Sequence, residues 1–187
     1  MTDFGIILYG PPAAGKSTTA RALSEFGATP YRPIKHGRGR SAGYRMVNAE
    51  EIERLRHSGD VAWEQQRYGS VYVWLRSELQ AAKHPVVELG QPEAVSTIIN
   101  ETDIAWTVAE LTCPRPVAVD RISARDTGDH AERIAAWDAT SSLMHADISI
   151  NTSKVPPATA AAAIWSAAYD TPKPQIADTQ EVRRKAP

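Results

Sequence analysis

Apolar runs and helix-like repeats alternate along most of the chain. The run FGIILY, Phe4–Tyr9, is continuous, as in a strand that is buried on both faces of a sheet. Similar strand-like runs follow later, and apolar residues at helical spacing lie between them. This alternation predicts an α/β protein with a parallel central sheet covered by helices on both faces. The later runs are PVVELG, DIAWTVAELT and ADISIN, and the main helical repeats are KSTTARALSEF, QPEAVSTIINE, AERIAAWDAT and the alanine-rich segment 157–168.

A short capped helix is predicted near residue 50. Asn48 and Glu51 have the spacing of a capping box, Ile52 and Leu55 fall on one face, and Gly59 is placed to end the helix. The segments VWLRSELQAAK and PRPVAVDRISAR, the latter after Pro116, are also predicted to be helical.

The stretch YGPPAAGKSTTA joins the first predicted strand to the first predicted helix. Gly10 and Gly15 permit backbone conformations in which successive N–H groups wrap a polyphosphate at a helix N-terminus. Lys16 is then placed to reach the β- and γ-phosphates, and the Ser17 hydroxyl to ligate Mg²⁺. The pattern predicts a phosphate-binding P-loop for ATP. Its expected ATP-binding residues are Gly10, Pro11, Pro12, Ala13, Ala14, Gly15, Lys16, Ser17 and Thr18.

Length and composition narrow the class of protein. The 187 residues, 42% of them apolar, suffice for one well-filled domain, and a net charge of -1 provides no basic field for nucleic acid. The single cysteine, Cys113, excludes an internal disulfide. We see no signal-peptide pattern and no run of 18 apolar residues, so we expect a cytoplasmic protein without membrane contact. The domain is expected to span residues 1–170, with a polar, flexible tail over 171–187.

Two arginine-rich segments interrupt the alternation. The first lies between Gly27 and Gly43 and is either a solvated loop or a site for a phosphate-bearing acceptor. It contains Arg32, Lys35, Arg38 and Arg40, and Arg45 follows just beyond it. The second contains the arginines Arg121, Arg125 and Arg133, which either face solvent on a helix or neutralise charge during phosphoryl transfer.

Six pieces of the chain resemble, in order, the motifs of the guanylate kinase family, whose close relative is ribose 1,5-bisphosphate phosphokinase. They are GPPAAGKS, PYRPIK, AGYRMV, RYGS, RISARDT and HADISIN, and together they extend over residues 4–168. The resemblance implies a P-loop NTPase three-layer fold with a small acceptor-binding subdomain near 29–73 and a lid over 121–133.

The same resemblance implies roles for particular residues. Arg121, Arg125 and Arg133 would join Lys16 as catalytic groups, and Asn151 would contact ATP. Glu64 and Glu88 are the candidates for recognising a base. The expected acceptor-binding residues are Arg32, Lys35, Tyr44, Glu64, Tyr68, Ser70 and Glu88.

The base pocket departs from the family pattern at Ala28, in the shortened WEQQ segment and at Gly90. Hydrogen bonds of this kind discriminate strongly between bases, so guanine specificity does not follow. The expected function is Mg²⁺-dependent transfer of the ATP γ-phosphate to a nucleoside monophosphate, GMP-like or modified. Ribose 1,5-bisphosphate as acceptor and a non-catalytic nucleotide-binding or protein-interaction module are the alternatives. The expected partner is a small phosphate-bearing molecule, and the protein would be a monomer or a homodimer.

Overall fold

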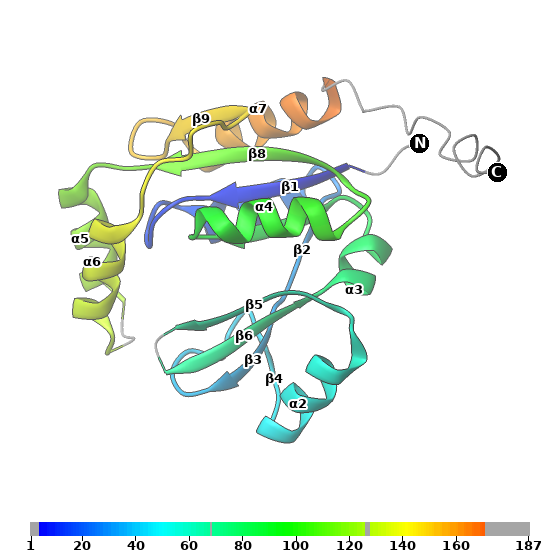
Figure 1. The fold of residues 1–187 in the computed structure, drawn as a ribbon. Coiled ribbons are helices and arrows are strands. Elements are labelled where there is room, and N and C mark those ends of the chain that lie inside the picture. The colour runs from blue at the N-terminus through cyan, green and yellow to red at the C-terminus, as the bar shows by residue number, and fades with distance from the viewer. Residues whose placement is uncertain (1–3, 68, 126–127, 171–187) are drawn as a thin grey trace.

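The computed structural model describes residues 4–67, 69–125 and 128–170. Its centre is a five-stranded sheet in the order β2-β7-β1-β8-β9, and every neighbouring pair in it is parallel (Figure 1). Parallel strands need crossover connections, which helices supply. In chain order the elements are β1 (Phe4–Tyr9), α1 (Lys16–Ser24), β2 (Thr29–Pro30), β3 (Ile34–Gly37), β4 (Arg45–Met46), α2 (Ala49–Ser58), β5 (Val61–Arg67), β6 (Ser70–Leu75), α3 (Arg76–Ala81), β7 (Pro85–Leu89), α4 (Pro92–Glu101), β8 (Ala105–Thr112), α5 (Arg115–Ser123), α6 (His130–Ala139), β9 (Ile148–Asn151) and α7 (Pro157–Asp170).

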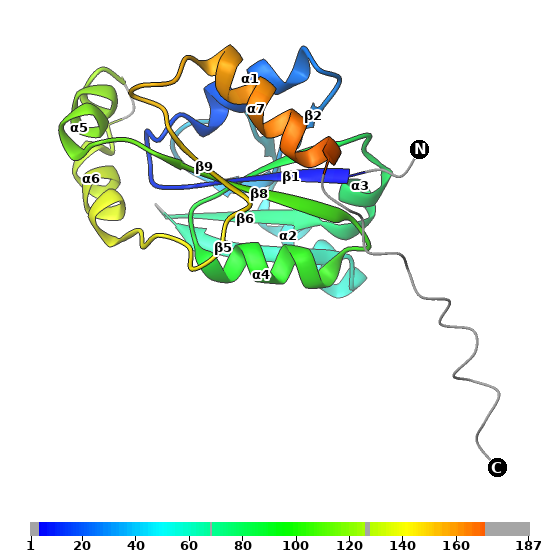
Figure 2. The ribbon, with the colours of Figure 1, turned by 90° about the horizontal axis from the view of Figure 1, so that it is seen from above.

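Helices cover both faces of the parallel sheet (Figure 2). Ile6 and Leu8 of β1 belong to a core shared with α1 and α7, whereas Ile7 and Tyr9 belong to a second core shared with α4. Successive strand residues point to opposite faces, so one continuous apolar run supplies both cores. The predicted α/β architecture with a parallel sheet between two helical layers is confirmed.

A smaller sheet, in the order β4-β3-β6-β5, lies apart from the central one (Figure 1). α2 packs on one of its faces, where Ile52 joins Ile34 and Val73 in a separate apolar cluster. As predicted, the Asn48 side chain caps α2 by accepting a hydrogen bond of 2.9 Å from the Glu51 amide, and the helix ends at Gly59.

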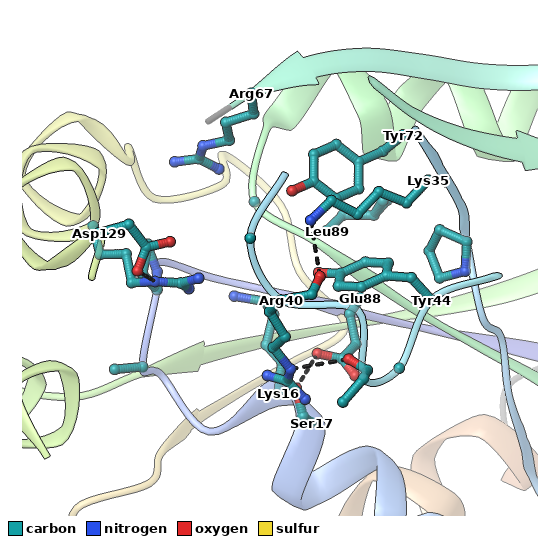
Figure 3. Close-up of a pocket in the computed structure, with 18 of the residues that line it drawn as sticks. Lys16, Ser17, Lys35, Arg40, Tyr44, Arg67, Tyr72, Glu88, Leu89 and Asp129 are labelled. Atoms are coloured by element: carbon teal, nitrogen blue, oxygen red, sulfur yellow. Dashed lines mark hydrogen bonds and ion pairs between the residues drawn. The ribbon is translucent and has the colours of Figure 1, made fainter. Parts of the chain in front are cut away.

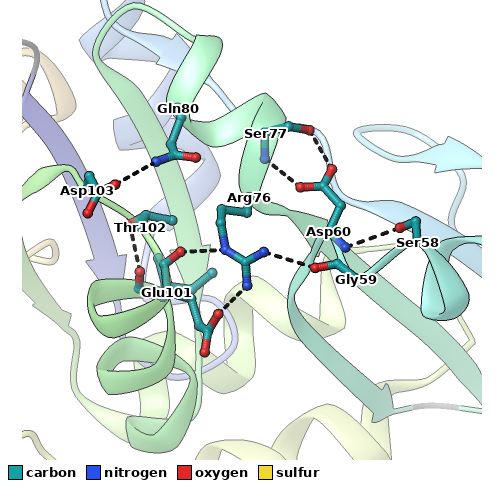
Figure 4. A network of polar contacts seen from close by, with 10 residues as sticks. Ser58, Gly59, Asp60, Arg76, Ser77, Gln80, Glu101, Thr102 and Asp103 are labelled. Atoms are coloured by element: carbon teal, nitrogen blue, oxygen red, sulfur yellow. Dashed lines mark hydrogen bonds and ion pairs between the residues drawn. The ribbon is translucent and has the colours of Figure 1, made fainter.

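A polar network joins the small sheet to the central one (Figure 4). Arg76, at the start of α3, donates to the carbonyl oxygens of Glu101 at 2.8 Å and Gly59 at 3.0 Å. Asp60 accepts a hydrogen bond of 2.9 Å from the amide of Ser77. The ends of α2 and α4 are thus both tied to the first turn of α3.

The β5–β6 hairpin and the start of α3 differ from the sequence prediction. Val73, Trp74 and Leu75 were predicted to begin a helix, but they form the end of β6, and α3 starts only at Arg76. The helix begins with the polar residues Arg76, Ser77 and Glu78, but the short apolar run before them fits a strand as well as a first helical turn. In the part of the chain that is described, none of the helices has both the length and the apolar character needed to cross a membrane.

Candidate active site

A pocket of about 500 Å³ opens where the carboxyl ends of β1 and β7 meet the small sheet and the α5–α6 region (Figure 3). One wall is the loop between β1 and α1. A second wall comes from β3, β5, β6 and the loop after β3, and a third from residues between α5 and α6. Ligands commonly bind at the carboxyl edge of such a sheet.

The loop between β1 and α1 follows the backbone course that its glycines predict. Gly10 has φ +147°, and a Cβ added there would lie 2.2 Å from the carbonyl oxygen of Leu111. Gly15 precedes α1 with φ +96°. The loop and the first residues of α1 line the pocket, and the N-terminus of a helix suits anions.

Lys16 is folded back onto this loop. Its ammonium donates to the carbonyl oxygens of Gly10 at 2.6 Å and Pro11 at 2.8 Å. Burial lowers the pKa of Lys16 to about 8, although the nearby carboxylate of Glu88 acts in the opposite direction. A bound polyphosphate would stabilise the charged form of this side chain.

Ser17 and Glu88 form a small oxygen-rich group beside Lys16. The Ser17 hydroxyl donates to Oε2 of Glu88 at 2.7 Å. Within the described ranges there is no group of three His, Cys, Asp or Glu side chains that could hold a metal ion. One hydroxyl and one carboxylate, completed by phosphate oxygens and water, fit Mg²⁺, which binds in this manner in many nucleotide sites.

Lys35 lies on the opposite wall beside two aromatic rings. Its side chain is 2% exposed, and its ammonium lies 5.4 Å from the ring centres of both Tyr44 and Tyr72. The two rings meet edge to face, with centres 5.3 Å apart and an angle of 61° between their planes, and the lysine chain lies next to them (Figure 3). The ammonium donates to the carbonyl oxygens of Arg38 at 2.6 Å and Arg40 at 2.8 Å. Burial lowers the pKa of Lys35, and the charge of Arg133 adds to the effect.

The β5–β6 hairpin presents alternate residues to the pocket. Gln65 pairs in register with Tyr72, and both line the pocket together with Arg67 and Trp74. Trp74 is 3% exposed, and its indole N–H has no hydrogen-bond partner. The hairpin thus supplies an amide, a guanidinium and two aromatic rings.

No protein-family profile matches the sequence, and no curated protein does. Solved structures of several kinases are similar in fold. A guanylate kinase from Anaplasma phagocytophilum has 16% identity and a TM-score of 0.62, and the match covers 98% of this chain and 96% of that one. A gluconokinase from Sinorhizobium meliloti 1021 has 14% identity and a TM-score of 0.54 over 89% and 94% of the two chains. A sugar kinase from Janibacter sp. HTCC2649 has 14% identity and a TM-score of 0.52 over 88% and 93%.

The chain has the fold of a P-loop kinase. The three likenesses, at 16% identity or less, establish this fold and nothing finer. In this P-loop kinase fold, most of the predicted donor-side residues line the pocket: Gly10, Pro12, Ala13, Gly15, Lys16, Ser17 and Thr18. Pro11 and Ala14 are not among the lining residues.

Asn151, predicted to contact ATP, instead makes side-chain hydrogen bonds within the turn that follows β9. Its side-chain oxygen accepts hydrogen bonds from the amide of Ser153 at 3.0 Å and from the Ser153 hydroxyl at 2.7 Å. It does not line the pocket.

The predicted acceptor-side residues are divided between the pocket and other places. Lys35, Tyr44 and Glu88 line the pocket. Arg32 is exposed and donates to the carbonyl oxygen of Tyr44 at 3.2 Å, and it is not among the lining residues. Tyr68 lies outside the described residues.

Ser70 is buried at 4% exposure beneath the pocket wall, where its hydroxyl donates to the carbonyl oxygen of Arg38 at 3.0 Å. It therefore contacts the loop after β3 and does not line the pocket itself.

Glu64, predicted to recognise a base, faces the wrong way. It neighbours Gln65 on β5, so it points to the other face of the small sheet. There it accepts two hydrogen bonds from Arg56 of α2, at 2.9 and 2.5 Å. Strand alternation places Gln65 in the pocket in its stead.

The three lid arginines also separate. Arg125 and Arg133 line the pocket, and Arg133 donates to Asp129 at 2.6 Å. Burial lowers the pKa of Arg125, and the charges of Arg133 and Arg40 contribute to that change. These cations are close enough to act on one anionic ligand.

Arg121, in contrast, lies behind the P-loop. It donates at 3.0 Å to the carbonyl oxygen of Ala13, to the hydroxyl of Thr152 and to the carbonyl oxygen of Thr152. Its guanidinium therefore braces the loop against the end of β9, and the predicted catalytic role does not fit this position.

The sequence prediction missed several pocket residues. Arg67, Tyr72 and Trp74 belong to the unrecognised hairpin, and Asp129 and Glu132 lie within the predicted lid segment. Alternation across the two strands of the hairpin could have found the first three.

Proposed function

We propose that the protein is an ATP-dependent phosphotransferase that moves the γ-phosphate of ATP to the phosphate of a small acceptor, such as a nucleoside monophosphate. The observation that carries this proposal is the pairing of two anion-binding walls across one pocket. A P-loop with Lys16 and Ser17 lies on one side, and Lys35, Arg38, Arg40 and Arg67 line the other. The similarity to a guanylate kinase agrees with this assignment.

On the donor side, the loop N–H groups and the ammonium of Lys16 would hold the polyphosphate of ATP. Ser17 and Glu88 would hold Mg²⁺, which when bound neutralises charge on the phosphate oxygens. For its ammonium to reach the phosphates, Lys16 must leave the carbonyl oxygens of Gly10 and Pro11 that it binds at 2.6 and 2.8 Å.

On the acceptor side, an ionised phosphate oxygen would attack the γ-phosphorus in line. The bond from the γ-phosphorus to the β–γ bridging oxygen breaks, and ADP leaves with that electron pair. An acceptor phosphate is largely ionised at neutral pH, so no general base is needed. Arg125 and Arg133 would stabilise charge on the transferring group and exclude water.

A bisphosphate sugar acceptor, ribose 1,5-bisphosphate, is the second candidate. Glu64 lies away from the pocket and Gly90 replaces the second expected acid, so two of the groups expected to recognise guanine are missing. The wall instead offers guanidinium groups and aromatic rings, which do not require a guanine base.

The test is a screen of acceptors with ATP and Mg²⁺, measuring ADP release. It would include GMP, dGMP, AMP, CMP, UMP and ribose 1,5-bisphosphate, with gluconate as a hydroxyl acceptor because one structural neighbour is a gluconokinase. Acceptor-dependent ADP release with a phosphate-bearing acceptor supports the proposal. ATP hydrolysis at one rate with every acceptor would contradict it and favour a non-catalytic or switch-like role for the P-loop.

A further inference from the structure

The loop between β3 and β4 carries two arginines along the acceptor wall. We name residues 38–43 the arginine loop. Arg38 and Arg40 both line the pocket, and so do Gly39, Ala42 and Gly43. The loop therefore adds positive charge to the wall opposite the P-loop.

Two buried side chains fix the backbone of the arginine loop from below. The ammonium of Lys35 donates to the carbonyl oxygens of Arg38 at 2.6 Å and Arg40 at 2.8 Å, and the hydroxyl of Ser70 donates to that of Arg38 at 3.0 Å. Gly37 precedes the loop with φ +124°, and a Cβ there would come within 2.5 Å of the Ser70 hydroxyl oxygen. The course of the loop is thus determined by groups that are themselves 2% and 4% exposed.

Lys35 is committed to this structural contact. Two of the three N–H groups of its ammonium are used by loop carbonyl oxygens, and the ring centres of Tyr44 and Tyr72 both lie 5.4 Å from it. The third N–H group is left for a ligand, so Lys35 can give a phosphate a single hydrogen bond while it keeps the loop bonds.

The arginines of the loop have a different environment. Both are exposed, and Arg40 donates from Nε to the carbonyl oxygen of Ala42 at 2.9 Å, which orients its guanidinium. Its charge is near enough to Arg125 to affect that residue. Meanwhile the carboxylates of Glu88 and Asp129 accept hydrogen bonds from Ser17 and Arg133. An anionic ligand would match the charge of the loop.

We propose that Arg38 and Arg40 bind the acceptor's phosphate, and that Lys35 is a positioning residue that holds their loop. The inference deepens the proposed function and rests on it. It replaces the direct acceptor contact expected of Lys35 with one made by two guanidinium groups, whose forked donors suit phosphate oxygens better than an ammonium does.

The first test is chemical footprinting of arginines with phenylglyoxal, followed by mass spectrometry. The full chain is first saturated with ADP and Mg²⁺ to fill the P-loop, and inorganic phosphate is then added as the probe. We expect phosphate to slow modification of Arg38 and Arg40 at least about fivefold and to leave exposed Arg54 of α2 unchanged. Equal reactivity of the loop arginines with and without phosphate would overturn the proposal.

The second test separates binding from positioning. Lys35→Met removes the ammonium but keeps an apolar chain next to the tyrosines, and Ser70→Ala removes one loop bond if the first variant does not fold. Both should raise the reactivity of Arg38 and Arg40 in the absence of phosphate, because the loop is released. Unchanged reactivity in a folded variant, together with weaker phosphate protection, would make Lys35 a direct ligand.

Kinetics completes the test once the acceptor screen provides a substrate. Arg38→Ala and Arg40→Ala should each raise the acceptor KM about tenfold or more and change the ATP KM less than about twofold. Arg54→Ala is the matched control. Transfer activity without loop protection would contradict this inference alone, whereas loop protection without transfer to any acceptor would contradict the proposed function alone.

Discussion

The two walls of the pocket, which we propose bind the phosphate donor and the acceptor, are built differently. The donor wall is the loop between β1 and α1 with the start of α1, one short stretch of chain, whereas the acceptor wall is assembled from β3, β5, β6 and the arginine loop. On the donor wall, Gly10 and Gly15 shape a loop that lines the pocket. On the acceptor wall, the position of a side chain depends on strand pairing between distant segments. Lys35 of β3, for example, pairs in register with Tyr72 of β6, 37 positions later in the chain.

This difference determines how each wall tolerates change. A main-chain site is preserved as long as its glycines and helix start are kept, because its donors do not depend on side-chain identity. A site built from side chains changes its ligand when a single strand position changes. We therefore expect the donor to be ATP under the family resemblance, while the acceptor depends on the small sheet.

The largest effect should come from Lys16→Met, which tests whether the main-chain groups of the donor wall suffice. We expect transfer to fall about 1,000-fold or more, since the charge on the β- and γ-phosphates would lose its ammonium partner. ADP release with the screened acceptor measures this. Lys83→Met, at an exposed position before β7, is the control. Retention of a tenth of the activity would mean that the loop amides carry the donor site without Lys16.

The second largest effect contrasts two arginines of the lid segment. Arg125→Ala should lower kcat about 100-fold because a cation that lines the pocket is lost, with little change in melting temperature.

Arg121→Ala should mainly destabilise the fold, by about 1–3 kcal/mol, because carbonyl oxygens of Ala13 and Thr152 lose their donor. Its effect on catalysis should appear as a higher ATP KM through the loosened P-loop. Thermal unfolding and steady-state kinetics of both variants measure these effects. An equal loss of kcat in the two variants would mean that Arg121 is catalytic, as the sequence predicted.

Sequence reasoning identified the donor wall because its signal is local. The strand, the glycines and the helix start are contiguous from Phe4 to Ser17, so no tertiary information is needed. The parallel sheet could be predicted for a similar reason, since each buried strand is a continuous apolar run.

The acceptor wall could not be predicted to the same extent. Glu64 and Gln65 differ only in which face of β5 they occupy, and that depends on the pairing of Gln65 with Tyr72. Arg121 and Arg125 are four positions apart, but α5 ends at Ser123, so helical spacing does not place Arg125. Lys35 is buried next to tyrosines of other segments, and the charge pattern gave no indication of this burial.

The pH dependence of ATP binding should distinguish the two walls further. The pKa of Lys16 is lowered to about 8 by burial, and bound phosphate should raise it again, so the complex holds more protons than the free protein above that pH. We expect the Kd for ATP to rise towards about tenfold per pH unit above about pH 8.5. Acceptor binding by arginines should change much less, because guanidinium groups stay charged.

Calorimetric titrations between pH 7 and pH 10 would measure this dependence. Lys16→Met provides the reference, since it should bind weakly at every pH without the steep rise. If the Kd for ATP of the unsubstituted protein stayed constant to pH 10, the charged ammonium of Lys16 would not contribute to ATP binding.

The smallest effect concerns two neighbours on β5 and tests the acceptor wall residue by residue. Gln65→Ala should raise the acceptor KM about fivefold, because an amide that lines the pocket is removed. Glu64→Gln, one position away, should leave that KM within about twofold, since its carboxylate contacts Arg56 on the other face of the sheet. Steady-state kinetics with varied acceptor at saturating ATP gives both values. The reverse order of effects would place Glu64 in the pocket during turnover, and it would mean that the small sheet rearranges when the acceptor binds.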